Sequence, residues 1–148
     1  MVIASGRRVR VELAAEPRSA QLARRLVGGA LHGWRLGQLE ETAALLVSEL
    51  ATNAVLHART DFLVEAEHRD GLVRVSVFDC SAAGPARRHS SLQASTGRGI
   101  GLVETLASAW GTGAAVRPWS KVVWFELSTD PDALPEPADG ALLERWPT

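Results

Sequence analysis

The stretch LLVSELATNAVLHA, residues 45–58, decides how the rest of the chain is interpreted. Within it Glu49, Asn53 and His57 stand four residues apart, and on a helix each such step drifts by about 40°. The three side chains therefore form a slowly turning line beside an apolar stripe, with Glu49 at the edge of the stripe, Asn53 nearer its middle and His57 almost on its axis. A carboxylate and an amide at the margin of a buried face are costly without partners, which indicates a site. The alternative is a solvated helix edge that ends in a core or hinge histidine. The stripe consists of Leu39, Ala43, Leu46, Leu50 and Ala54.

Composition bounds the class of protein. The chain has 148 residues, enough for one domain, and its net charge of −1 gives no support for a nucleic-acid binder. The single cysteine, Cys80, excludes an internal disulfide and fits a reducing cytoplasm. The N-terminal sequence lacks the apolar core of a signal peptide, and no apolar run approaches the roughly 20 residues of a membrane span. We therefore expect a cytoplasmic protein with no direct nucleic-acid or membrane partner.

The apolar periodicities predict the order of helices and strands. Asp70-Gly71 lies between two alternating segments and is a strong hairpin signal. The order of elements indicates an α+β two-layer sandwich, in which helices cover one face of a mixed, mostly antiparallel sheet. Strands are predicted at residues 7–13, 62–68, 72–79, 112–117 and 121–128, and helices at 18–33, 38–58 and 99–109.

One strand is expected to end in a functional side chain. Val73, Val75 and Val77 share one face of the strand 72–79, and Asp79 continues that face. The carboxylate of Asp79 should therefore emerge from the buried side of the sheet rather than from the solvent side.

Two segments lack any periodicity. Residues 80–98 are small and polar, and a loop of this length in a compact domain is usually functional or disordered. The tail at 130–148 is rich in proline and acidic residues and is expected to be loosely ordered, although Leu142, Leu143 and Trp146 could dock.

A glycine-rich run opens the third predicted helix. Glycines there let backbone N–H groups approach an anion, and a helix N-terminus favours negative charge, so a nucleotide phosphate is a natural guest. Glycine clusters are common at helix starts, and the run alone leaves a purely structural role open. Its spacing is neither a Rossmann fingerprint nor a Walker A loop. The run reads Thr96-Gly97-Arg98-Gly99-Ile100-Gly101-Leu102.

The combination of these features resembles the GHKL ATP-binding fold of gyrase, heat-shock chaperones, histidine kinases and MutL. The features are Glu49 and Asn53 on one helix, Asp79 at a strand end, the loop 80–98 and the glycine run. Within that group the chain is similar to the short bacterial anti-sigma-factor serine kinases. The resemblance covers about residues 8–128, so residues 1–129 are expected to form the ATP-binding domain and 130–148 a C-terminal tail.

The resemblance implies a role for each matching residue. Glu49 would act as the base or orient the attacking group, and Asn53 would hold Mg²⁺, a hard cation that takes oxygen ligands. Asp79 would accept a hydrogen bond from the adenine amino group, and residues 80–98 would form the ATP lid. The glycine box that borders the phosphates would comprise Gly97, Arg98, Gly99, Ile100, Gly101 and Leu102.

Two positions depart from the family pattern. The glycines expected just after Asp79 are replaced by residues 80–83, and Gly84 is the nearby candidate for that role. Relatives often have a threonine near the adenine in the final strand, and Val122 is expected to occupy its place. With valine in that place, Asp79 would lose a helper in binding the adenine.

The resemblance implies an anti-sigma-type regulator that binds Mg-ATP. It would hold a sigma factor through its helical surface, phosphorylate a serine of an anti-sigma antagonist protein, and could form a homodimer. One alternative is a histidine-kinase catalytic domain, which is disfavoured because no dimerisation helix with a phospho-acceptor histidine precedes residue 7. The other is a non-catalytic module that uses ATP as a structural ligand or has lost it.

Overall fold

The computed structural model describes residues 2–5, 7–81, 103 and 106–130. Its strands are β1 (Val2–Ser5), β2 (Arg8–Leu13), β3 (Phe62–Arg69), β4 (Leu72–Asp79), β5 (Ala109–Ala114) and β6 (Lys121–Ser128). Its helices are α1 (Ser19–Gly33) and α2 (Glu40–Asn53), with a short 3₁₀ turn η1 (Gly37–Leu39) before α2 and a π-helical turn η2 (Ala54–Ala58) after it. None of these helices is long and apolar enough to cross a membrane.

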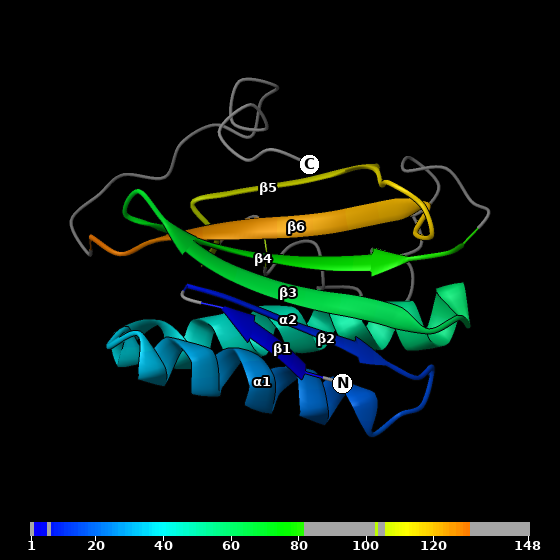
Figure 1. Ribbon diagram of the computed structural model, residues 1–148, viewed down its shortest axis with the longest axis horizontal. Helices are drawn as coiled ribbons and strands as arrows, with labels where there is room; N and C mark the ends of the chain where they lie inside the picture. Colours follow the sequence, from blue (N-terminus) through cyan, green and yellow to red (C-terminus); the bar gives the residue numbers. More distant parts are fainter. Residues whose placement is uncertain (1, 6, 82–102, 104–105, 131–148) are drawn as a thin grey trace.

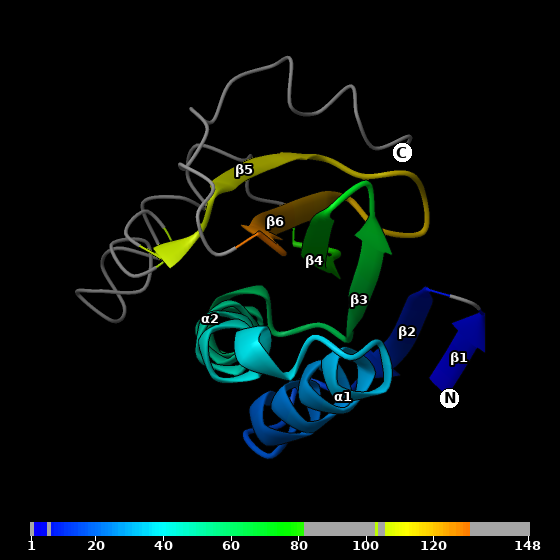
Figure 2. The ribbon, with the colours of Figure 1, turned by 90° about the vertical axis from the view of Figure 1, so that its left-hand side faces the viewer.

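The strands form one sheet in the order β1-β2-β3-β4-β6-β5, and every pairing in the described part is antiparallel. Helices α1 and α2 lie side by side against one face of the sheet, as the two views of the ribbon show (Figures 1 and 2). The two-layer α+β sandwich predicted from the sequence is confirmed.

The core lies between the sheet and these helices. Because strand side chains alternate between faces, every second residue of β2, β3, β4 and β6 points toward the helices. The helices contribute apolar side chains at spacings of three and four, which places them on one face. Fully buried members are Ala23, Val27 and Leu31 of α1, Ala43, Leu46 and Val47 of α2, Val64 and Ala66 of β3, Val73 and Val75 of β4, and Phe125 of β6.

The predicted hairpin is confirmed. Asp70 and Gly71 connect β3 to β4, with φ angles of 53° and 76°. Positive φ at both positions matches the right-handed twist of the strands, and Asp-Gly is the pair that adopts it readily.

The strand assignments differ from the structure in two places. β5 is Ala109–Ala114 rather than 112–117, so Trp110 and Gly111 belong to a strand and do not close a helix. β1 adds an edge strand that the sequence analysis did not predict. Most of the predicted helix 99–109 lies outside the described residues, although buried Val103 accepts a helical hydrogen bond from the backbone N–H of Ala107.

Candidate functional site

The residues singled out in α2 and β4 lie at the same end of the molecule. The C-terminal end of α2 and the end of β4 are both on the right in Figure 1, and α2 and η2 both pack against β4. Two contacts connect the segment after η2 to the strand end: Phe62 pairs with Asp79, and the backbone N–H of Cys80 donates to the Thr60 hydroxyl at 3.3 Å. The helix end and the strand end therefore form one local unit.

Asn53 is the central polar group on the helix side. It is fully buried, and its Nδ2 donates to the backbone carbonyl of Glu49 at 2.8 Å. This bond turns the amide nitrogen toward the helix backbone and so fixes the orientation of the amide. The amide oxygen is the atom of this side chain that has the chemistry of a cation ligand. Glu49 itself is half-buried, one turn earlier on α2. The predicted gradient from the edge of the buried face to its interior is confirmed for these two residues.

The prediction for His57 is wrong. His57 is exposed, and so is Leu56, because residues 54–58 form a π-helical turn instead of a continued α-helix. A π turn adds a residue to the helical repeat, so side chains beyond Asn53 rotate away from the positions that a 3.6-residue period predicts. The turn ends at Arg59, whose φ of 57° is left-handed. His57 is therefore a surface residue next to the site and not a core histidine.

Asp79 is the central polar group on the sheet side. Its side chain is 1 % exposed and lies on the helix-facing side of β4 with Val73, Val75 and Val77, as predicted. Its Oδ1 accepts a hydrogen bond from the backbone N–H of Ser81 at 2.9 Å. The carboxylate is thus held at the end of the strand, inside the layer that separates sheet and helices.

The strand end is fixed by Ser120 as well. The backbone N–H and the hydroxyl of Ser120 both donate to the carbonyl oxygen of Asp79, at 2.8 and 3.2 Å, and the hydroxyl also contacts the carbonyl of Ser81 at 2.9 Å. These bonds hold Asp79 and Ser81, at the end of β4, against Ser120, the residue before β6.

The neighbour of Asp79 on β6 is Lys121 and not Val122. In the antiparallel register Asp79 pairs with Lys121, and Phe78 pairs with Val122. Lys121 therefore shares the helix-facing side with Asp79 and is buried, whereas Val122 lies on the opposite face. The expectation for Val122 is wrong by one residue. Counting from buried Val123 and Phe125 with a period of two would have placed Lys121 correctly.

The remaining predicted site residues lie outside the described part of the chain. They are Gly84 and the glycine-box residues Gly97, Arg98, Gly99, Ile100, Gly101 and Leu102, together with most of the lid 80–98. Their roles stay predictions.

A protein-family model described as a histidine kinase-like ATPase domain matches residues 13–120. The match spans α1, α2, β3, β4 and β5 and includes Glu49, Asn53 and Asp79. A comparison with curated proteins finds no match.

Proposed function

The chain belongs to the histidine kinase-like ATPase domain family, and we propose that it is a Mg-ATP-binding regulator that phosphorylates a serine of a protein partner. The observation that carries the proposal is the burial of two polar side chains at the same end of the molecule, Asn53 at the end of α2 and Asp79 at the end of β4. Buried polar groups cost free energy, so their presence at one end of an otherwise apolar layer favours a ligand-recognition role over a purely structural one.

Asp79 would recognise the adenine. A carboxylate is an acceptor and suits an exocyclic amino group, which adenine carries and guanine lacks at the same ring position. The anchoring of its Oδ1 by Ser81 keeps the group in place before the nucleotide binds, so little ordering remains to oppose binding.

Asn53 would hold the magnesium ion. The fit is chemical: an amide oxygen is a hard ligand, and Mg²⁺ usually takes only one or two protein ligands while phosphate oxygens and water supply the others. Consistent with that division, the described residues contain no group of three His, Cys, Asp or Glu side chains that could cage a metal. Bound Mg²⁺ would supply charge neutralisation at the phosphates.

Glu49 would act on the attacking hydroxyl. In the proposed step the serine oxygen forms a bond to the γ-phosphorus, the bond from that phosphorus to the β–γ bridging oxygen breaks, and ADP leaves with that oxygen. The serine proton passes to the Glu49 carboxylate. Such transfer depends on positioning and charge stabilisation more than on covalent help from the protein, and Glu49 is only half-buried, so a second protein could reach it.

The partner classes follow from the resemblance to anti-sigma-factor serine kinases. The serine would belong to an anti-sigma antagonist protein, and a sigma factor would bind the helical layer. The nucleotide chemistry and the partner identity are separate parts of the proposal and are tested separately.

Glu49→Ala distinguishes catalysis from binding. A positioned carboxylate that accepts a proton in the transition state contributes about 10²–10⁴-fold to rate, but as an anion it adds nothing to affinity for anionic ATP. The variant should therefore keep or slightly tighten Mg-ATP binding in calorimetry and lose nearly all labelled-phosphate transfer to the antagonist. Glu41→Ala, at an exposed position in the first turn of the same helix, is the matched control and should transfer at the wild-type rate. Equal transfer by Glu49→Ala and wild type would show that Glu49 is structural.

One observation favours a second candidate, an ATP-binding module without transferase activity. Lys121 pairs with Asp79 across β4 and β6 and is buried on the same face, so its positive charge would lie on the side where the adenine amino group is proposed to bind. If the wild-type protein binds Mg-ATP and transfers phosphate to no antagonist tested, this second candidate is the better one.

A further inference from the structure

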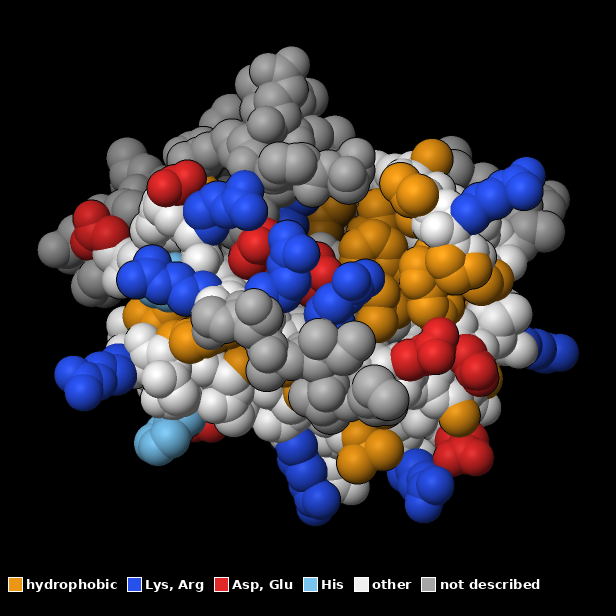
Figure 3. Space-filling view, in the orientation of Figure 1, with side chains coloured by type: hydrophobic (Ala, Val, Ile, Leu, Met, Phe, Trp, Pro, Cys, Tyr) orange, Lys and Arg blue, Asp and Glu red, His pale blue; other side chains and the backbone are white. Residues whose placement is uncertain are grey.

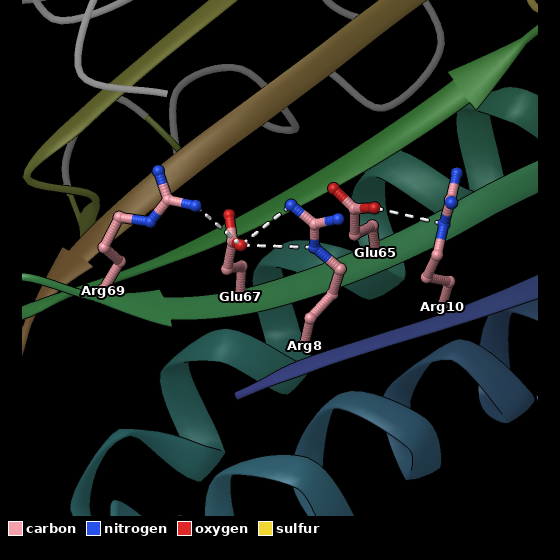
Figure 4. A network of polar contacts seen from close by, with 5 residues as sticks. All are labelled: Arg8, Arg10, Glu65, Glu67 and Arg69. Carbon is pink, nitrogen blue, oxygen red and sulfur yellow. Dashed lines mark hydrogen bonds and ion pairs between the residues drawn. The ribbon is translucent and has the colours of Figure 1, made fainter. Parts of the chain in front are cut away.

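The charged side chains of the sheet are divided unequally between its two faces. The outer face, which points away from α1 and α2, carries a charge network on β2 and β3 (Figure 4). Its ion pairs join Glu67 to Arg8 at 2.9 Å and to Arg69 at 3.2 Å, and Glu65 to Arg10 at 3.2 Å. The space-filling view shows acidic and basic side chains gathered near the centre of this face (Figure 3).

On β4, β5 and β6 the outer face also carries a stack of three residues. Arg74 contacts Glu126 at 3.2 Å, and its guanidinium lies 4.1 Å from the ring centroid of Trp124. The indole lies across Gly111, because a Cβ on Gly111 would come within 2.7 Å of the ring. Gly111, Trp124 and Arg74 form this stack, and the charges of Arg74 and Glu126 are satisfied within the sheet.

The helix-facing side carries a different kind of charged pair. Among the strand residues that the structure describes, Asp79 and Lys121 are the aspartate, glutamate, lysine or arginine residues on that side. They pair with each other across β4 and β6, and they are only 1 % and 3 % exposed. The Cβ atoms of directly opposed residues lie about 4.5–5.5 Å apart, so a carboxylate and an ammonium side chain start side by side at the end of the sheet.

Apolar side chains surround this pair within the sheet. The last helix-facing row of the sheet runs, from β2 across β3, β4 and β6 to β5, through Leu13, Phe62, Asp79, Lys121 and Ala114. Buried Val77 and Val123 occupy the corresponding places in the next row inward. A flat ring with apolar faces and polar groups along one edge suits such a place, since ligand sites are mostly apolar with a few precisely placed polar groups.

The backbone fixes the relative positions of the two residues. Ser120, which precedes Lys121, donates its backbone N–H to the carbonyl of Asp79 at 2.8 Å, and its own carbonyl accepts from the N–H of Ala115 at 3.1 Å. The Asp79 carboxylate accepts from the N–H of Ser81 at 2.9 Å. Both residues therefore hold their places at the strand ends before a ligand binds.

The chemistry of the pair matches one edge of adenine. A buried ion pair contributes little to stability that apolar residues would not supply, so stability alone does not explain it. A carboxylate only accepts hydrogen bonds and an ammonium group only donates them. Adenine presents the complementary groups at adjacent ring positions, because its 6-amino group donates and its ring nitrogen N1 accepts. The ammonium repels the amino group but suits N1.

We propose that Lys121 reads the nucleobase: its ammonium group donates to N1 of the adenine whose 6-amino group donates to Asp79. The inference rests on the proposed nucleotide function and adds to it a second contact with the base, from β6. It makes Lys121 a specificity-determining residue.

Calorimetry with two nucleotides tests the role of Lys121. One is Mg-ATP, and the other is its 1-deaza analogue, in which a C–H group replaces N1 and the amino group is kept. The wild-type protein should bind ATP about tenfold or more tightly than the analogue, because the analogue loses a hydrogen bond to a charged group. In Lys121→Met, which has a side chain of similar length without a donor, ATP affinity should fall to that of the analogue.

Two further variants are controls. Arg24→Met removes the same positive charge from an exposed position on α1 and should keep the wild-type preference for ATP over the analogue. Lys121→Arg keeps a charged donor at the site and should retain most of that preference. The ratio of the two affinities is the informative quantity, because a general effect of charge or stability changes both affinities alike.

Equal affinity of the wild-type protein for the two nucleotides would overturn the role of Lys121 and leave the ATP site in place. This comparison needs no substitution, so it stands even if Lys121→Met does not fold. A preference that persists in Lys121→Met would also overturn the proposal, and an equal loss of both affinities would assign the ammonium to the phosphates. Tighter binding of GTP than of ATP by the wild-type protein would contradict it in favour of a contact from Lys121 to O6 of guanine. Binding of no nucleotide at all would instead remove the proposed function itself.

Discussion

At the scale of single residues, Asn53 and Asp79 are two buried polar side chains that need hydrogen-bond partners. Each is almost completely removed from solvent, and leaving such a group without a partner costs about 1–3 kcal/mol. Both are bonded to backbone groups, Asn53 to the carbonyl of Glu49 and Asp79 to the N–H of Ser81. The fold therefore tolerates these polar side chains in its apolar layer and holds them where the proposed ligand would bind.

Replacement of Asp79 by asparagine should reduce nucleotide selectivity. The amide keeps the size of the side chain but presents a donor as well as a weaker, neutral acceptor, so ATP affinity should fall by roughly tenfold while GTP affinity changes little. Calorimetry with both nucleotides measures the difference. Asp70→Asn is the matched control, because Asp70 lies in the turn at the other end of β4 and asparagine tolerates its left-handed φ. Equal affinity of the wild-type protein for ATP and GTP would contradict adenine recognition by Asp79.

Whether the face of a side chain could be predicted from the sequence depended on whether the local helix or strand period was regular. Alternation along β4 was sufficient to place Asp79 on the buried face, and the helical period was sufficient for Glu49 and Asn53. His57 could not be placed, because the π turn after Asn53 changes the period without a signal in the sequence. Lys121 was missed because the strand was aligned to the family pattern at Val122 and not counted from its own alternation.

At the scale of elements, strong patterns were predicted and weak ones were not. β3 and β4 show alternation and β6 is heavily apolar, and all three were predicted to within a residue at each end. β5 was displaced by three residues because Ala109–Ala114 contains two glycines and one large apolar side chain, which gives no alternation to read. Its pairing with β6, a long-range contact, decides its position. Strand β1 lies at the sheet edge, where tertiary context again decides.

The contact between Gly111 of β5 and the Trp124 ring of β6 leaves little room for a side chain at position 111. A Cβ at this position would meet the Trp124 ring at 2.7 Å, so Gly111→Ala must displace the indole and the Arg74 guanidinium above it. We expect a loss of about 1–3 kcal/mol of unfolding free energy, the usual cost of overpacking, measured by denaturant titration. Gly113→Ala in the same strand is the control, because its Cβ would meet Val122 at 3.9 Å, an ordinary contact. Equal stability of the two variants would argue against the stack.

At the scale of the whole molecule, the two faces of the sheet have different chemistry. The helix-facing side is mainly apolar, with Asp79 and Lys121 at the end where α2 carries Asn53, and with His68 at the other end, against Trp34. The outer side carries ion pairs and a stacked tryptophan. Because successive residues of a strand face opposite sides, a single sheet can keep the proposed ligand site and the charge network on separate faces.

Ligand binding at one end should stabilise the entire domain. A ligand that binds only the folded state adds about 2.7 kcal/mol at 100 times its dissociation constant, so saturating Mg-ATP should raise the melting temperature by roughly 5–15 °C.

Asn53→Ala removes the amide oxygen proposed to hold magnesium and also loses a buried hydrogen bond, so its starting melting temperature should be lower. The informative quantity is therefore the shift on adding ligand, measured for each protein with Mg-ATP and with ATP plus a chelator. The wild-type shift should depend strongly on magnesium, and that dependence should largely disappear in Asn53→Ala, whereas Asp70→Asn should keep it. Absence of any wild-type shift at millimolar Mg-ATP would remove the support for a nucleotide site, and a full magnesium dependence in Asn53→Ala would assign the metal to other groups.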